Sequence, residues 1–68
     1  MKGKVKTFYI EKGYGFITAD NGENRDIFVH CRNLILESYL SAGDVVEFDL
    51  EETSKGLKAH NVRKVSGE

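Results

Sequence analysis

Two short segments with alternating aromatic and aliphatic residues set the strongest constraint on how this chain can fold. They span residues 14–19 and 26–30, and each is long enough for one β-strand. Successive side chains of a strand point to opposite faces of the sheet. One face would carry Tyr14, Phe16, Thr18, Phe28 and His30, and the other would carry Gly15, Ile17, Ala19, Ile27 and Val29. We therefore expect the two strands to bury the aliphatic face in a core and to leave the aromatic face outside.

An exposed row of aromatic rings needs a physical reason, because the outer face of a half-buried sheet is normally polar. Flat rings stack well on other flat groups, and the bases of single-stranded nucleic acids are such groups. The competing interpretation is that the rings pack in the core, in which case the two faces are inverted. The burial of Phe16 and Phe28 relative to Ile17 and Val29 decides between these interpretations.

The length and composition fit one small domain that covers residues 1–68. Apolar residues make up 40% of the chain, which is enough for one core, and charged residues make up 31%. The single cysteine, Cys31, excludes an intramolecular disulfide framework. No apolar run fits a signal peptide or a membrane span, so we expect a cytoplasmic protein that does not associate with membranes.

The formal net charge of −1 argues against a nucleic-acid-binding protein, but the charges are unevenly distributed. Lys2, Lys4, Lys6 and Lys12 lie near the start of the chain, whereas residues 44–52 contain five acidic side chains and no basic one. Such asymmetry permits one basic face on a nearly neutral molecule. A pair of ordinary solvated faces is the equally consistent alternative.

Three further segments have the alternation of strands, at residues 2–10, 45–51 and 57–65. The connecting turns are expected at residues 11–13, 20–24, 42–44 and 53–56, and residues 31–41 are expected to form a loop with one helical turn. Five short strands on so short a chain favour an all-β, closed or nearly closed barrel.

Strict alternation also predicts which side chains point inward from the first and fourth strands. Lys4, Lys6 and Phe8 would share one face of the first strand, opposite Val5, Thr7 and Tyr9. Val46, Phe48 and Leu50 would point inward from the fourth strand. The alternation of the fifth strand breaks near residues 59–61, which indicates a β-bulge.

Taken together, these segments resemble a cold-shock domain over nearly the whole chain. The Lys12-Gly13-Tyr14-Gly15-Phe16-Ile17 segment resembles the first ribonucleoprotein motif of that family, and Ile27-Phe28-Val29-His30 resembles the second. Residues 3–6 resemble the family's opening, residues 42–48 its turn and fourth strand, and residues 55–62 its last hairpin. Both motifs in this order, in a chain of this length, form a specific signal.

The resemblance implies a five-stranded antiparallel oligonucleotide-binding (OB) barrel that binds single-stranded RNA or DNA with low sequence specificity. It also implies a role as an RNA chaperone or transcription antiterminator. By motif, the implied nucleic-acid-binding residues are Lys6, Phe8, Lys12, Tyr14, Phe16, Asp26, Phe28, His30 and Lys55. Tyr39 is added by a looser match to an aromatic of the family's loop, and Lys58, which departs from the family pattern, is added because its charge would supply a phosphate contact. The aromatics and the histidine would stack on bases, and the lysines would contact phosphates or base edges. For Asp26, a bond to a base edge and a turn cap remain alternatives.

The chain departs from the family pattern at several positions. Thr7 and Cys31 stand where the family usually has aromatic residues, and Tyr9 stands where asparagine is usual. The loop between His30 and Gly43 is about two residues shorter than in the family. These departures concern affinity and base preference more than the fold.

Other functional classes find little support in the sequence. A zinc site formed by His30, Cys31 and His60 is disfavoured, because structural zinc sites use four ligands that usually come in close pairs. We expect no catalytic residues, no metal and no cofactor. The main alternative is a protein-interaction or dimerisation module on the same barrel, with weak or no nucleic-acid binding. A monomer is the expected state, and a homodimer is the alternative.

Overall fold

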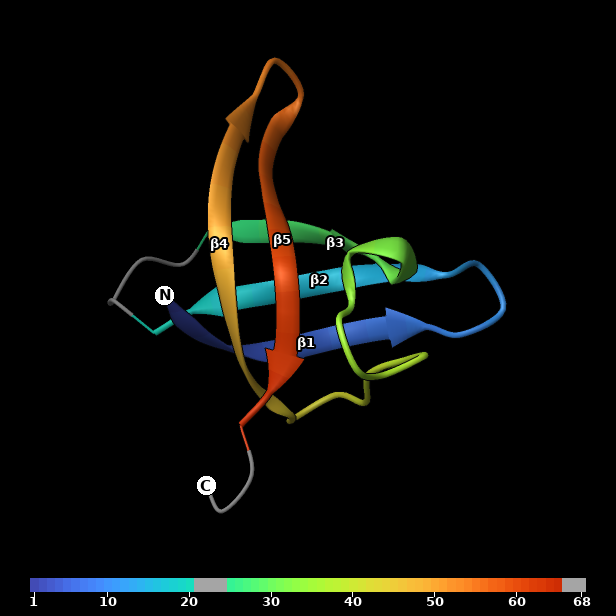
Figure 1. Cartoon of the computed structure of the whole chain (residues 1–68). Coiled ribbons are helices and arrows are strands. Elements are labelled where there is room, and N and C mark those ends of the chain that lie inside the picture. The colour runs from blue at the N-terminus through green and yellow to red at the C-terminus, as the bar shows by residue number, and fades with distance from the viewer. Residues whose placement is uncertain (21–24, 66–68) are drawn as a thin grey trace.

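Five strands close into a barrel in the computed structural model, which describes residues 1–20 and 25–65 (Figure 1). In chain order the elements are β1 (Lys2–Tyr9), β2 (Tyr14–Ala19), β3 (Asp26–His30), the single 3₁₀ turn η1 (Cys31–Asn33), β4 (Val45–Thr53) and β5 (Gly56–Lys64). The strand order around the barrel is β1-β2-β3-β5-β4. Neighbours are antiparallel except for β3 and β5, which run parallel. The predicted all-β OB barrel is confirmed.

The predicted strands agree with the observed ones to within two residues. β2 and β3 have the predicted bounds, whereas β1 ends one residue early at Tyr9 and β4 continues to Thr53. The predicted helical turn is η1, which begins directly after His30. The turn predicted at residues 20–24 falls on residues 21–24, which lie outside the described part of the chain.

The aliphatic faces of the strands fill the barrel. Ile17 and Val29 are both 0% exposed, so the predicted inner faces of β2 and β3 are confirmed. The core consists of Val5, Ile17, Ala19, Ile27, Val29, Leu40, Val46, Phe48, Leu57, Ala59 and Val62. Burying one such aliphatic side chain stabilises the fold by roughly 1.5–3 kcal/mol, so the inner faces dominate the stability of so small a domain.

A bulge in β1 overturns the predicted alternation of that strand. Val5 pairs with Ile17, but the next paired residue is Thr7, which lies opposite Phe16. Lys6 is therefore the extra residue, and every side chain after it switches faces. Phe8 consequently does not share a face with Lys4 and Lys6, contrary to the prediction.

Phe8 instead lies opposite Gly15 and packs, half-buried, against the core. A Cβ atom on Gly15 would lie 2.7 Å from the Cα and one ring carbon of Phe8, and 2.3 Å from the carbonyl oxygen of Thr7. The missing side chain of Gly15 thus makes room for the Phe8 ring between β1 and β2.

β4 and β5 extend beyond the barrel as a projecting hairpin (Figure 1). Leu50 lies beyond the part of β4 that pairs with β1 and is 40% exposed, so its prediction as a core residue is wrong. The predicted bulge in β5 is confirmed, because the pairing shifts between Glu47–Arg63 and Asp49–His60, and Asn61 has a positive φ of 52°. The bulge lies within the part of β5 that closes the barrel, because Leu57 and Lys58 on one side of it pair with β3 and Val62 on the other side is buried in the core.

Two leucine substitutions test where the core ends. Leu57→Ala removes a side chain that is 8% exposed, and we expect a loss of about 2–5 kcal/mol in the free energy of unfolding. Leu50→Ala removes the same atoms from an exposed position, so we expect a loss below about 1 kcal/mol. Urea unfolding followed by circular dichroism measures both. Equal losses would show that Leu50 belongs to the core.

Candidate nucleic-acid interface

The register between β2 and β3 places four rings side by side on the outside of the barrel. Tyr14 pairs with His30, and Phe16 pairs with Phe28. The ring centroids are 5.9 Å apart for Phe16 and Phe28, 5.7 Å for Tyr14 and Phe28, and 6.4 Å for Phe28 and His30. All four side chains are partly exposed. The predicted aromatic face is therefore confirmed as one contiguous surface.

A fifth ring, which the sequence prediction did not include, joins this surface from β1. Tyr9 pairs with Tyr14, its ring centroid lies 5.7 Å from that of Tyr14, and it is 45% exposed. Simple alternation placed Tyr9 with Val5 on the inner side. The bulge at Lys6 reverses this assignment. The outward position of Tyr9 could therefore be recognised only from the register between β1 and β2, which the structure provides. We call the surface formed by Tyr9, Tyr14, Phe16, Phe28 and His30 the aromatic face.

His30 and Cys31 connect the aromatic face to the following loop. The backbone N–H of Arg32 donates to Nδ1 of His30 over 3.2 Å, so the neutral imidazole carries its proton on Nε2. The Cys31 backbone N–H donates to the carbonyl oxygen of Gly13, and the half-buried thiol lies 3.7 Å from Nδ1 of His30. Cys31 thus packs against the β1–β2 turn rather than adding to the row of rings.

A groove lies where the aromatic face meets the projecting hairpin. Its volume is about 520 Å³, and Phe16, Phe28, Leu57 and Lys58 line it together with residues 53–56. Phe28 and Lys58 are neighbours in the parallel β3–β5 pairing, which places this lysine beside the ring. Apolar rings with lysines beside them match a nucleotide, which combines a flat base and an anionic phosphate.

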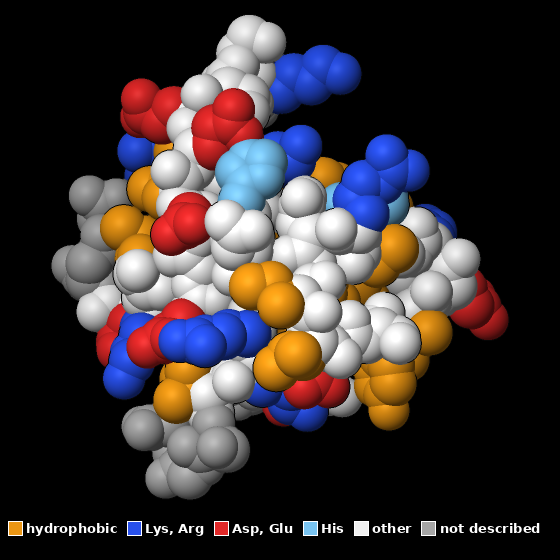
Figure 2. All heavy atoms as spheres, in the orientation of Figure 1, with side chains coloured by type: hydrophobic (Ala, Val, Ile, Leu, Met, Phe, Trp, Pro, Cys, Tyr) orange, Lys and Arg blue, Asp and Glu red, His pale blue; other side chains and the backbone are white. Residues whose placement is uncertain are grey.

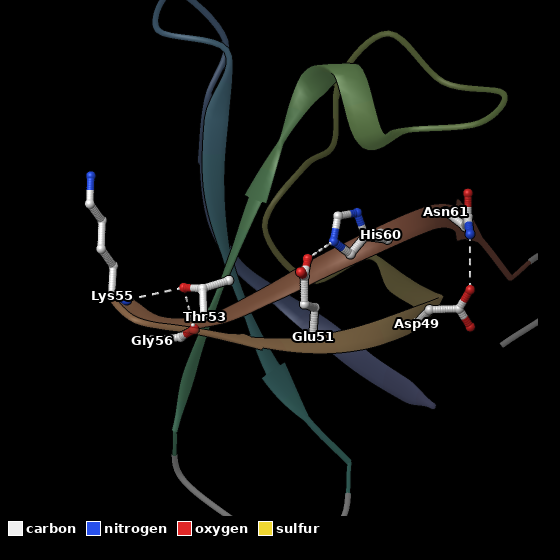
Figure 3. A network of polar contacts seen from close by, with 7 residues as sticks. All are labelled: Asp49, Glu51, Thr53, Lys55, Gly56, His60 and Asn61. Carbon is white, nitrogen blue, oxygen red and sulfur yellow. Dashed lines mark hydrogen bonds and ion pairs between the residues drawn. The ribbon is translucent and has the colours of Figure 1, made fainter.

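Hydrogen bonds within the hairpin hold its tip in place (Figure 3). The Thr53 hydroxyl donates to the carbonyl oxygen of Gly56 over 2.8 Å, and the Lys55 backbone N–H donates to the Thr53 Oγ1 over 3.2 Å. Gly56 has a φ of 135°, which a residue with a Cβ rarely adopts. The tip therefore presents Lys55 from a defined turn.

The remaining predicted residues lie around this surface at different distances from the rings. Lys6 and Asp26 form an exposed ion pair of 3.2 Å between β1 and β3. The Lys12 ammonium lies 5.6 Å from the centroid of the Tyr9 ring. Tyr39 is exposed in the loop before β4, and no ring contact joins it to the aromatic face among the described residues.

The outer face of β4 and β5 carries charged and polar side chains instead of aromatic rings. Acidic side chains of β4 alternate there with basic and polar partners from β5 (Figure 2). Arg63 binds Glu47 over 2.9 Å, Asn61 donates to Asp49 over 2.9 Å, and His60 hydrogen-bonds Glu51 (Figure 3). Arg63 therefore compensates the charge of Glu47, and Asp49 and Glu51 are held by hydrogen bonds within this hairpin.

The described residues supply neither a metal centre nor a membrane anchor of the helical kind. Within 1–20 and 25–65, no group of three or more histidine, cysteine, aspartate or glutamate side chains is arranged to hold a metal ion. In the same part of the chain, no helix has the length and apolarity that a membrane span requires.

The barrel and its ring surface define an OB-type nucleic-acid-binding domain, and known proteins give the family. The family model described as the 'Cold-shock' DNA-binding domain matches residues 1–65. A cold shock-like protein of Thermotoga maritima is 48% identical over 67 residues, which cover 96% of this chain and 98% of that protein. A cold shock-like protein of Aquifex aeolicus is 48% identical over 64 residues, or 91% of this chain and 90% of the relative. The cold shock protein CspC of Bacillus subtilis is 42% identical over 65 residues, or 93% of this chain and 96% of the relative. This chain belongs to the cold-shock domain family, whose domains bind nucleic acids.

The Glu51–His60 contact predicts a change of stability at acidic pH. The hydrogen bond from His60 is the main cause that lowers the pKa of the Glu51 carboxyl below its usual 4.5 in the folded protein. The unfolded chain then binds the proton more readily, so this contribution is present above pH 4.5 and is lost as the pH falls through the folded-state pKa. Because the pair is exposed, we expect a small effect.

Urea midpoints measured over the acidic range check this expectation. Glu51→Gln should flatten the fall in stability below pH 4.5, whereas Glu52→Gln, a change of the neighbouring exposed residue, should leave the slope unchanged. Identical slopes for Glu51→Gln and the unmodified protein would show that the contact adds nothing in solution.

Proposed function

We propose that this protein binds single-stranded RNA or DNA with low sequence specificity by stacking bases on the aromatic face. The observation that carries the proposal is the set of partly exposed, contiguous rings backed by a closed aliphatic core. A partly exposed ring stabilises the fold less than a ring that is fully buried in the core. A base that stacks on such a ring, in contrast, gains roughly 1–3 kcal/mol of binding free energy. The stacking is tolerant of sequence because every base has a π-face.

Each predicted residue has a place in this proposal. Bases stack on Tyr14, Phe16, Phe28 and His30, with contributions from Phe8 and Tyr39. The lysines that contact phosphates are Lys6, Lys12, Lys55 and Lys58. Asp26 accepts a hydrogen bond from a base edge when it is not paired with Lys6. Since Phe8 packs partly against the core, its removal should lower stability as well as affinity.

The proposed mode of binding favours unpaired strands. Bases in a duplex are already stacked and paired, so only a single strand can lay its bases on the rings. A protein that binds the unpaired form shifts RNA folding equilibria by mass action, without an energy source or a cofactor. We therefore propose a role as an RNA chaperone or transcription antiterminator that is not an enzyme. We also propose that residues 1–68 form one cytoplasmic domain that acts as a monomer.

The energies make this function feasible. Three or four stacks of roughly 1–3 kcal/mol supply about 3–12 kcal/mol, and together with lysine–phosphate contacts they reach the range of the roughly 8 kcal/mol that micromolar binding needs. A purely electrostatic binder would need more basic residues than a chain of net charge −1 offers.

A protein-interaction or dimerisation module is the second candidate. The exposed loop residues Ile35 and Leu36, the latter 78% exposed, favour it. The aromatic face could also be covered by a second copy of the chain. Nucleic-acid titration and measurement of the mass in solution separate these two functions.

Two ring substitutions test the binding face. Phe16→Ala and Phe28→Ala should each weaken binding of a fluorescently labelled oligothymidine by roughly 1–3 kcal/mol, because each removes one stacking platform. Both variants should remain folded by circular dichroism, since neither ring belongs to the buried core. Leu36→Ala removes an exposed apolar side chain from the loop and should leave the affinity unchanged. If the unmodified protein binds no oligonucleotide at low salt, the interaction module becomes the better candidate.

Salt dependence tests the role of the lysines. With three or four phosphates contacted, log K should fall with log salt at a slope of about −2 to −3, using roughly −0.7 per phosphate for single strands. Lys55→Met and Lys58→Met, both at the groove, should each reduce the steepness by about 0.7. Lys64→Met is the matched control, because that lysine lies 3.5 Å from Asp44, in the turn before β4, and does not line the groove. A steeper loss for Lys64→Met than for the groove lysines would place the binding face elsewhere.

A further inference from the structure

The aromatic face is longer than the sequence motifs indicate, and its extra ring is Tyr9. This residue ends β1 at the rim of the barrel, where the chain turns toward β2. Its side chain is 45% exposed although it contacts Tyr14. The ring is therefore accessible to a stacking partner from solvent.

The bulge at Lys6 is what places Tyr9 on this surface. Because the register shifts between Val5 and Thr7, Tyr9 pairs with Tyr14 on the outer side of the sheet. The same shift brings Thr7 opposite Phe16, where its small side chain adds no ring. The rings of β1 and β2 therefore continue toward the β1–β2 turn rather than along the middle of β1.

A positive charge accompanies the extra ring. The Lys12 ammonium lies 5.6 Å from the centroid of the Tyr9 ring, within the range of a cation–π contact. Because the ammonium lies over the ring, a base that stacks on this side of Tyr9 displaces it, and the displaced lysine remains close enough to contact the phosphate of the same nucleotide. The turn thus combines an exposed ring with a cation, as does the groove at the opposite end of the aromatic face.

We propose that Tyr9 and Lys12 form an additional nucleotide subsite at the β1–β2 rim. The subsite stacks one base of a single strand on Tyr9 and contacts its phosphate with Lys12. The Tyr9 and Tyr14 rings are inclined by 67°, so the strand rotates as it passes from one ring to the next. This inference rests on the proposed binding of single strands, and it adds that the bound strand runs from the hairpin groove to the β1–β2 turn.

A series of labelled oligothymidines of increasing length tests the subsite. A short oligomer can occupy Phe16 and Phe28 and leave Tyr9 empty, whereas a long one covers the whole face. Tyr9→Ala should therefore weaken binding of an oligomer of about nine nucleotides by at least about 5-fold, and of an oligomer of about four nucleotides by less than about 2-fold. Tyr9→Phe should retain the affinity for both, because stacking needs the ring and not the hydroxyl.

Matched controls separate a binding role from a structural one. Ile10→Ala changes the adjacent exposed apolar residue and should alter neither affinity. An equal loss at both lengths for Tyr9→Ala would show that Tyr9 acts through Tyr14, and unchanged affinity at both lengths would show that the rim binds no base. Either result overturns the proposal.

A second measurement uses the unmodified protein. Oligonucleotides that carry 5-iodouracil crosslink to aromatic residues on which the base stacks, and mass spectrometry of the digest locates the adducts. Adducts on Tyr9 with long oligomers support the subsite, and adducts confined to β2 and β3 contradict it.

If no oligonucleotide binds the unmodified protein, the proposed function fails together with the subsite. Binding that depends on Phe16 and Phe28 but not on Tyr9 removes the subsite alone.

Discussion

The packing of the aliphatic side chains of β2 and β3 against each other inside the barrel is the interaction on which the surface depends. Ile17 and Val29 are fully buried, and each lies between two residues of the opposite face. Because side chains alternate along a strand, burial of the aliphatic residues forces the rings outward. The same hydrophobic burial that stabilises a small domain therefore also creates its binding surface.

Closure of the barrel then determines which parts of the chain border the rings. The parallel pairing of β3 with β5 brings Lys58 beside Phe28, although the two residues are far apart in sequence. The hairpin of β4 and β5 extends past the barrel and supplies one wall of the groove. At the other end, the last residue of β1 supplies the Tyr9 ring, and the β1–β2 turn supplies Lys12. The aromatic face is thus bordered at both ends by a lysine-bearing turn.

The charge distribution reconciles a net charge of −1 with the binding of an anionic polymer. Arg63 of β5 compensates the charge of Glu47 of β4, and Asn61 and His60 hold Asp49 and Glu51 by hydrogen bonds. Exposed pairs of this kind stabilise the fold only slightly. Their larger consequence is electrostatic, because they leave the lysines beside the rings as the charges that a bound strand would meet first.

The sequence by itself determined the strands, their number and the two faces of β2 and β3. Apolar residues that alternate every two positions can be recognised in a single strand, without knowledge of the strand with which it pairs. It also determined the family, since both ribonucleoprotein motifs are local patterns. Only the tertiary structure decided whether the side chains of Phe8, Tyr9 and Leu50 lie in the core or on the surface. Those three depend on pairing between strands. A one-residue bulge reversed the faces of β1 beyond Lys6, and β4 continues past its pairing with β1, which leaves Leu50 outside the core. Register is a property of two strands together, so no pattern within one strand contains it.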